Sequence, residues 1–247
     1  MQQDMMRPKS ALYYIKDIET VAVELTDKVL AGRDKKGKIN IVTPCKEFSL
    51  DAISLIFLGG KIGALAGSED ADELIQRMDF FMKYGFFLYM CPTKLVQWLP
   101  FYKQVVTNSN KTVDLLVKHI EKAKESIDTE DESVLAKLIE KHGRDSKIPL
   151  VMAMDALGAG IDTTGNSAAL LLYHLATNQD KQELLHQEII SILGKDGSLS
   201  SSSLAKMRYL KACQQESTRL LPITSGIIRE TQVSFLDVLT LYSVPRL

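Results

Sequence analysis

One stretch, residues 148–178, limits what this chain can fold into. It reads IPLVMAMDALGAGIDTTGNSAALLLYHLATN and is apolar at nearly every helical position. As a single helix it would extend roughly 45 Å, at about 1.5 Å per residue. Asp155, Asp162, Asn166 and His174 interrupt the apolar residues, so no run approaches the ~20 residues that a bilayer span needs. We therefore expect a central helix, buried by other helices on most of its sides.

The middle of this stretch contains residues that weaken a helix. Gly158, Gly160 and Gly165 each cost about 1 kcal/mol relative to alanine in a helix interior. Asp162 and Thr163 are also weak helix formers, because their side chains compete for backbone hydrogen-bond partners. A long helix that collects such residues needs a functional reason or a close contact that compensates for them.

Helical spacing suggests two sources of compensation. Ala159, Gly160, Thr163 and Thr164 are related by steps of three and four, so we expect them to share a small face that carries two hydroxyls. A flat, bulky group could lie against this face, with Asp162 about 100° away in a proton relay. The alternative is a helix packed closely on a neighbour, with Thr163 bonded back to the carbonyl of Ala159. Spacing alone leaves both interpretations open.

Periodicity along the chain indicates a mainly α protein. Trp98 is expected to anchor the connection that Pro92 and Pro100 break. A loop is expected at 195–203, and strand patterns occur only in GIIRETQV and FLDVLTLY near the C-terminus. Helices are expected at 10–31, 43–58, 68–90, 101–126, 133–142, 148–178, 180–193 and 204–220.

Two motifs add a resemblance to a known family. Residues 159–164 read Ala-Gly-Ile-Asp-Thr-Thr, and residues 216–219 read Glu-Ser-Thr-Arg. In this order and at this distance they resemble the A-G-x-D-T-T and E-x-x-R signatures of the cytochrome P450 superfamily, the heme-thiolate monooxygenases. The resemblance implies a partial cytochrome P450 fold, from the family's third helix through its E-x-x-R helix, with a small β appendage. We expect a single partial domain over residues 1–247.

The resemblance implies roles for the residues of the first motif. Thr163 would donate a hydrogen bond to the dioxygen that the heme activates, and Asp162 would carry protons in from solvent. Splitting the O–O bond takes protons at a dry site, and an acid and an alcohol together deliver them without flooding it. Ala159, Gly160 and Thr164 would contact the heme and let it approach the helix closely.

The resemblance also implies roles nearer the C-terminus. Glu216 and Arg219 would form a buried structural pair tied to a later loop. Arg229 would pair with a heme propionate. Lys211 matches one of two basic positions with which mitochondrial members dock a ferredoxin, but the other position is Gln215 here.

The cysteines depart from the family pattern. The family's iron is held by a cysteine thiolate, in a loop beyond the E-x-x-R helix, and Cys45, Cys91 and Cys213 match no such position. No metal ligand is therefore assigned, and the sequence reads as an internal or truncated fragment. We expect the isolated chain to form no heme-thiolate complex and to be inactive alone. The absence of a C-x-x-C pair fits a reducing compartment.

Two functions are compatible with these observations. The texts GIDTTGNSAALLLYHLATN and YLKACQQESTRL resemble the animal mitochondrial-type branch. The parent protein would then use heme b, O2 and NADPH-derived electrons delivered by a ferredoxin to oxidise a lipophilic substrate, steroid-like or xenobiotic. It would act on the matrix side of the mitochondrial inner membrane. The alternative is a catalytically dead helical protein without heme, acting as a ferredoxin-binding decoy.

Composition excludes one further class. The net charge of −1 gives no electrostatic case for a nucleic-acid partner. The fractions of hydrophobic residues, 45%, and of charged residues, 25%, are ordinary for a globular protein. Nothing before residue 30 reads as a targeting segment or anchor, so membrane association of the parent would not be encoded here.

Overall fold

The computed structural model describes residues 13–90, 95, 98–127, 131–194 and 197–224, and within these ranges it contains helices and no strand. The mainly α class is therefore confirmed. The two predicted strands, and Arg229 with them, lie outside the described residues. The helices in the described ranges are α2 (Ile15–Ala31), α3 (Val42–Leu58), α4 (Glu69–Met90), α6 (Tyr102–Ser126), α7 (Val134–His142), α8 (Lys147–Thr177), α9 (Gln179–Leu193), α10 (Ser201–Lys206) and α11 (Arg208–Leu220).

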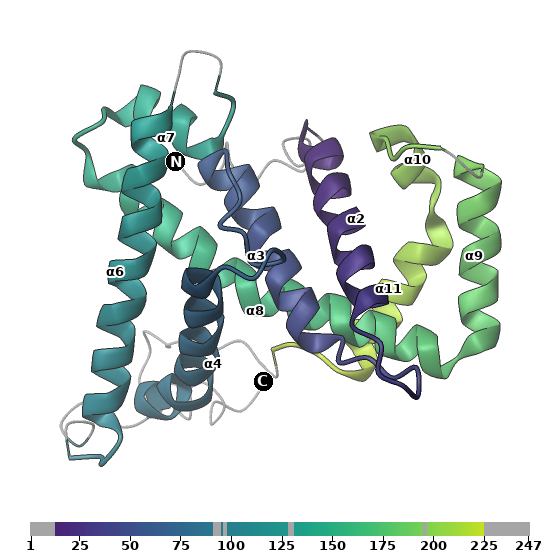
Figure 1. Ribbon diagram of the computed structural model, residues 1–247, viewed down its shortest axis with the longest axis horizontal. Helices are drawn as coiled ribbons and strands as arrows, with labels where there is room; N and C mark the ends of the chain where they lie inside the picture. The colour runs from purple at the N-terminus through teal and green to yellow at the C-terminus, as the bar shows by residue number, and fades with distance from the viewer. Residues whose placement is uncertain (1–12, 91–94, 96–97, 128–130, 195–196, 225–247) are drawn as a thin grey trace, which may run out of the picture.

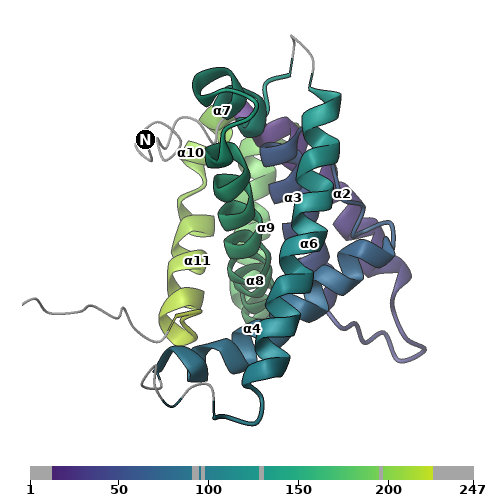
Figure 2. The same ribbon diagram turned by 90° about the vertical axis from the view of Figure 1, so that its left-hand side faces the viewer.

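Helix α8 is the element around which the others are arranged. It begins beside α7, passes behind α3 and ends beside α9, so it joins the two ends of the molecule (Figure 1). Helices α4 and α6 pack together near one end, and α9, α10 and α11 gather at the other. Seen from the end, α8 stands between α6 and α11 (Figure 2). The predicted central helix is confirmed, and its bounds agree with the prediction to one residue at each end.

Both ends of α8 follow from local chemistry. The side chain of Ser146 accepts a hydrogen bond from the backbone N–H of Ile148 at 3.3 Å, and Pro149 occupies the first turn, where a missing N–H costs nothing. One side of α8 is buried at every fourth residue, and the other side is exposed at Val151 and Tyr173. The prediction that α8 is covered on most sides is thus wrong for the described part of the chain. The buried stripe consists of Ala153, Leu157, Ile161, Gly165 and Ala169.

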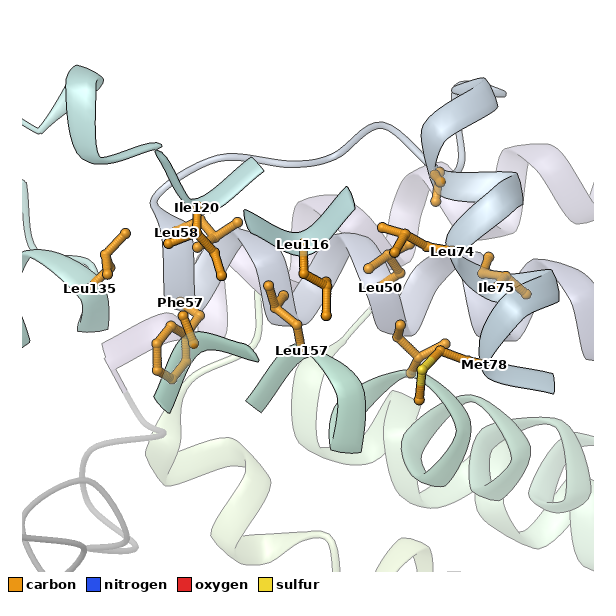
Figure 3. Packing of buried hydrophobic residues seen from close by; sticks show 14 of the residues in the cluster. Leu50, Phe57, Leu58, Leu74, Ile75, Met78, Leu116, Ile120, Leu135 and Leu157 are labelled. Carbon is orange, nitrogen blue, oxygen red and sulfur yellow. The ribbon is translucent and has the colours of Figure 1, made fainter. Parts of the chain in front are cut away.

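The hydrophobic core lies where α3, α4, α6, α7 and α8 meet. Side chains from all five helices point toward one another in Figure 3. Burying a leucine or phenylalanine side chain contributes roughly 1.5–3 kcal/mol, so this cluster fixes α8 against α3 and α4. Its members include Leu50, Phe57 and Leu58 of α3, Leu74, Ile75 and Met78 of α4, Leu116 and Ile120 of α6, Leu135 of α7 and Leu157 of α8.

Three local predictions are wrong. The loop predicted to run to residue 203 ends at residue 200, because residues 201–203 begin α10, where the side chains of Ser200 and Ser203 each bond the other's backbone N–H in a capping box. The helix predicted at 204–220 is divided at Met207 into α10 and α11. Trp98 does not anchor its connection, since the residue is 80% exposed.

Within the described ranges, no helix combines the length and the hydropathy that crossing a bilayer requires.

Candidate active site

The exposed part of the predicted face consists of Ala159, Thr163 and Thr164 on α8. The hydroxyl of Thr163 donates to the carbonyl of Ala159 at 2.8 Å, which confirms the predicted back-bond. The same oxygen keeps two acceptor lone pairs, so the back-bond leaves Thr163 able to accept a hydrogen bond from a group on the open side. Small side chains and a hydroxyl are thus presented together on an uncovered face.

An apolar hollow continues this face toward the end of α8. Its volume is about 540 Å³. Asn166, Leu170 and Tyr173 line it, and they follow Thr163 at steps of three and four along the helix. Pro222 and Ile223, beyond α11, close its far side. The hollow thus begins about one helical turn beyond Thr163, and its walls are mainly apolar.

Gly160 does not belong to the exposed face, so this part of the prediction is wrong. A Cβ atom built on Gly160 would lie 3.0 Å from Cγ1 of Ile53 on α3. At Gly165 a Cβ atom would lie 2.8 Å from the Cα atom of Lys46, which is tighter than real contacts allow. Both glycines therefore serve the close approach of α8 to α3.

Asp162 lies in a buried charge cluster. Only 5% of the residue is exposed, and its Oδ1 lies 2.8 Å from the ammonium of Lys46 on α3. The same ammonium contacts Asp79 on α4, whose side chain is 52% exposed. Burial lowers the pKa of Lys46, but hydrogen bonds with the two carboxylates outweigh burial, so its pKa is raised. The cluster connects the buried carboxylate of Asp162 to solvent through one cation.

A second contact from α3 reaches the same turn of α8. The hydroxyl of Ser49, which is 2% exposed, donates to the backbone carbonyl of Gly160 at 2.7 Å. Ser49 and Lys46 are three residues apart on α3, so both point toward α8. Sequence reasoning missed both residues. The available signal was the unusual number of polar residues in KEFSLDAIS, which lies within the helix predicted at 43–58.

The described residues fit one side of a heme and provide no ligand for its iron. The face of Ala159, Thr163 and Thr164 offers a flat group close approach to the helix. Cys45 is fully buried in α3, and burial raises its pKa to about 11. Burial also raises the pKa of the half-buried Cys213, with a smaller contribution from Glu188.

An iron-bound cysteine must be a thiolate, which a low pKa and an electropositive setting favour. Cys45 is fully buried within α3 and Cys213 lines a hollow between α8, α9 and α11, so neither described cysteine lies on the exposed face of α8. Cys91 lies outside the described residues. No group of three or more His, Cys, Asp or Glu side chains in the described ranges could hold a metal ion. The part of the chain that the structure describes therefore offers a flat group an open face on α8 and no ligand for its iron.

The predicted pair on α11 forms, but on the surface. Arg219 donates two hydrogen bonds of 2.7 Å to the two carboxylate oxygens of Glu216. These hydrogen bonds lower the pKa of Glu216. The side chains are 67% exposed at Arg219 and 55% exposed at Glu216, so the predicted burial is not observed in the described residues. An exposed pair contributes little to stability, even with this bidentate geometry.

The remaining predicted residues are separated from the exposed face. Lys211 is exposed on α11. A hollow of about 350 Å³ between α8, α9 and α11 is lined by His174, Cys213 and Glu216. His174 lies three turns beyond Thr163 along α8, so this second hollow is distinct from the face of Thr163.

Comparison with known proteins gives one consistent result. The cytochrome P450 family model matches residues 1–240. Two relatives are 31% identical over 98% of this chain and 46% of their own length: probable mitochondrial cytochrome P450 12b2 of Drosophila melanogaster and mitochondrial cytochrome P450 12b1 of Drosophila acanthoptera. Probable mitochondrial cytochrome P450 12a5 of Drosophila melanogaster is 29% identical over 91% of this chain and 45% of its own length. The chain thus spans a little under half the length of these relatives.

Proposed function

The chain belongs to the cytochrome P450 family, and on this basis we propose that the protein of which it is part is a heme monooxygenase. The observation that carries the proposal is the exposed face of Ala159, Thr163 and Thr164, with an apolar hollow that begins about one turn further along α8. When bound, heme supplies the chemistry that activates O2 for insertion of one oxygen atom. The apolar walls favour a lipophilic substrate.

The residues of α8 supply protons and exclude water. Thr163 holds a proton at Oγ1, in its bond to the carbonyl of Ala159. Rotation of this hydroxyl toward the open face presents the proton to a polar group there. Asp162, the adjacent residue, is the buried carboxylate that takes up a proton from the solvent side and passes it on to restore the proton of Thr163. Because the two groups lie on different sides of α8, the acid delivers protons without itself bringing water to the reacting atoms.

Other residues hold this arrangement in place. Ala159 and Thr164 lie against the cofactor. Gly160 acts indirectly, because its contact with α3 sets the position of α8. The family resemblance further proposes Arg229 as a propionate partner, and Glu216 with Arg219 as a support for the cofactor-binding segment.

The relatives support a proposed electron source and location. Mitochondrial relatives support a mitochondrial protein that receives NADPH-derived electrons through a ferredoxin. Lys211 is exposed on α11 and is the proposed docking residue. We place the protein on the matrix side of the inner membrane, with a steroid-like or xenobiotic substrate. Family membership favours this function over that of a heme-free, ferredoxin-binding decoy.

Isotope labelling tests the proposed reaction. A full-length protein that contains this segment is incubated with a lipophilic probe, ferredoxin, its reductase, NADPH and ¹⁸O2. We expect one labelled oxygen atom in each molecule of product, and no label when ¹⁸O is supplied only as water. Product labelled from water, or no oxygenated product with a heme-loaded protein, would refute the function.

A further inference from the structure

Three charged residues on three helices meet beside the proposed oxygen-side face. Lys46 of α3 is 8% exposed, and its ammonium lies 2.8 Å from Oδ1 of Asp162 on α8. The same ammonium also contacts Oδ1 of Asp79, which reaches it from α4. Because α4 packs against both α3 and α8, one cation joins all three helices.

Asp162 depends on this cation. Oδ2 of Asp162 is buried without a hydrogen-bond donor in the described part of the chain. A buried carboxylate is costly to keep ionised unless a charge or donors compensate for it. The nearest backbone offers none, because α8 already uses its N–H groups internally. Lys46 is therefore the group that compensates the charge of Asp162.

Asp79 competes for the same ammonium from the solvent side. Its side chain is half-exposed, whereas those of Lys46 and Asp162 are 10% and 7% exposed. The strength of the contact between Lys46 and Asp162 thus depends on the position of α4. The neighbouring buried carboxylate on α3, Glu47, does not compete, since it is paired with Lys28 at 2.6 Å.

We propose that Lys46 is the positioning residue of Asp162: its ammonium fixes the orientation of this buried carboxylate, and Asp79 shares the same ammonium. This inference rests on the proposed function, in which Asp162 supplies protons. Without the Asp79 carboxylate, the ammonium is left with Asp162 alone.

The pairing is tested first without heme, by double-mutant cycles on the free energy of unfolding. Lys46→Met keeps the aliphatic stem and removes the charge. With Asp162→Asn we expect a coupling of about tenfold or more in the unfolding equilibrium constant. With Asp79→Asn we expect a smaller coupling, because that carboxylate is solvated. Should Lys46→Met alone fail to fold, addition of Asp162→Asn is expected to restore folding, because it removes the uncompensated charge. Additive effects, or no restoration, would overturn the pairing.

The positioning role is tested in the heme-loaded full-length protein by product formed per electron. Lys46→Met is expected to lose most of this yield, as Asp162→Asn does, and Lys46→Arg to recover part of it. Lys118→Met is the matched control. The ammonium of Lys118 lies 2.6 Å from Oδ2 of Asp70, and this pair joins α6 to α4 without involving α8. If Lys46→Met keeps the yield that Asp162→Asn loses, only this inference fails. If Asp162→Asn also keeps the yield, the proposed proton role fails as well.

Discussion

Replacement of Gly165 by alanine tests the close approach of α8 to α3. Gly165 belongs to the buried stripe of α8 and faces α3. The added Cβ would lie 2.8 Å from the Cα atom of Lys46 and 3.0 Å from the carbonyl oxygen of Cys45. Both are backbone atoms of a regular helix, so no side-chain rotation relieves the overlap. The helices must separate instead.

The net effect follows from two opposing contributions. Alanine gains about 1 kcal/mol over glycine in a helix interior. Overpacking costs about 1–3 kcal/mol, and a backbone contact places Gly165 near the upper end of that range. We therefore expect Gly165→Ala to lower the free energy of unfolding by about 2 kcal/mol.

Gly158→Ala is the matched control on the same helix. The added Cβ would meet only Cε of Met78, at 3.9 Å, which is an ordinary contact. Gly158→Ala should therefore be stabilised by the higher helix propensity of alanine, with no steric cost. Urea unfolding followed by far-ultraviolet circular dichroism measures both variants. We expect them to differ by about 3 kcal/mol, with Gly158→Ala the more stable. Equal stabilities would refute the close approach of α8 to α3.

Three further predictions concern charge and cofactor binding. Asp51→Ala should lower the free energy of unfolding by roughly 3 kcal/mol or more, because the buried carboxylate accepts three backbone hydrogen bonds. An unchanged midpoint of urea unfolding would argue against this stabilising role. Burial lowers the pKa of His119 more than Asp70 raises it, so folding favours the uncharged imidazole. The free energy of unfolding should therefore fall as pH drops below about 6.5, and His119→Asn should reduce this dependence on pH. Finally, the 247-residue chain, with added heme, reductant and carbon monoxide, should show no red-shifted thiolate–carbonyl band; such a band would implicate one of Cys45, Cys91 and Cys213.

The helices were predictable because their signals are local. The apolar period of 148–178 placed α8 to within one residue at each end. Gly59 ends α3 in the left-handed conformation, which agrees with the helix predicted to end at residue 58. The serine cluster before α11 misled the prediction, because serine occurs in loops and in helix caps alike. Only the reciprocal bonds between Ser200 and Ser203 distinguish these two cases.

The site was predictable only in part, because its completion depends on tertiary contacts. The motif identified Asp162 and Thr163, and spacing anticipated the back-bond of Thr163. Nothing on α8 itself indicates that Asp162 finds its cation on α3, more than a hundred residues earlier. Spacing also could not show that Gly160 faces Ile53, since one helix alone does not specify which side a neighbour covers.

The most direct test of the account is the yield of product per electron in Thr163 variants of the heme-loaded full-length protein. Thr163→Val keeps the shape of the side chain and removes the hydroxyl, whereas Thr163→Ser keeps the hydroxyl. We predict that Thr163→Val binds heme and substrate normally but consumes NADPH with release of peroxide, and that Thr163→Ser retains most of the yield. An unchanged yield in Thr163→Val would contradict the account and leave the back-bond to Ala159 as the hydroxyl's whole role.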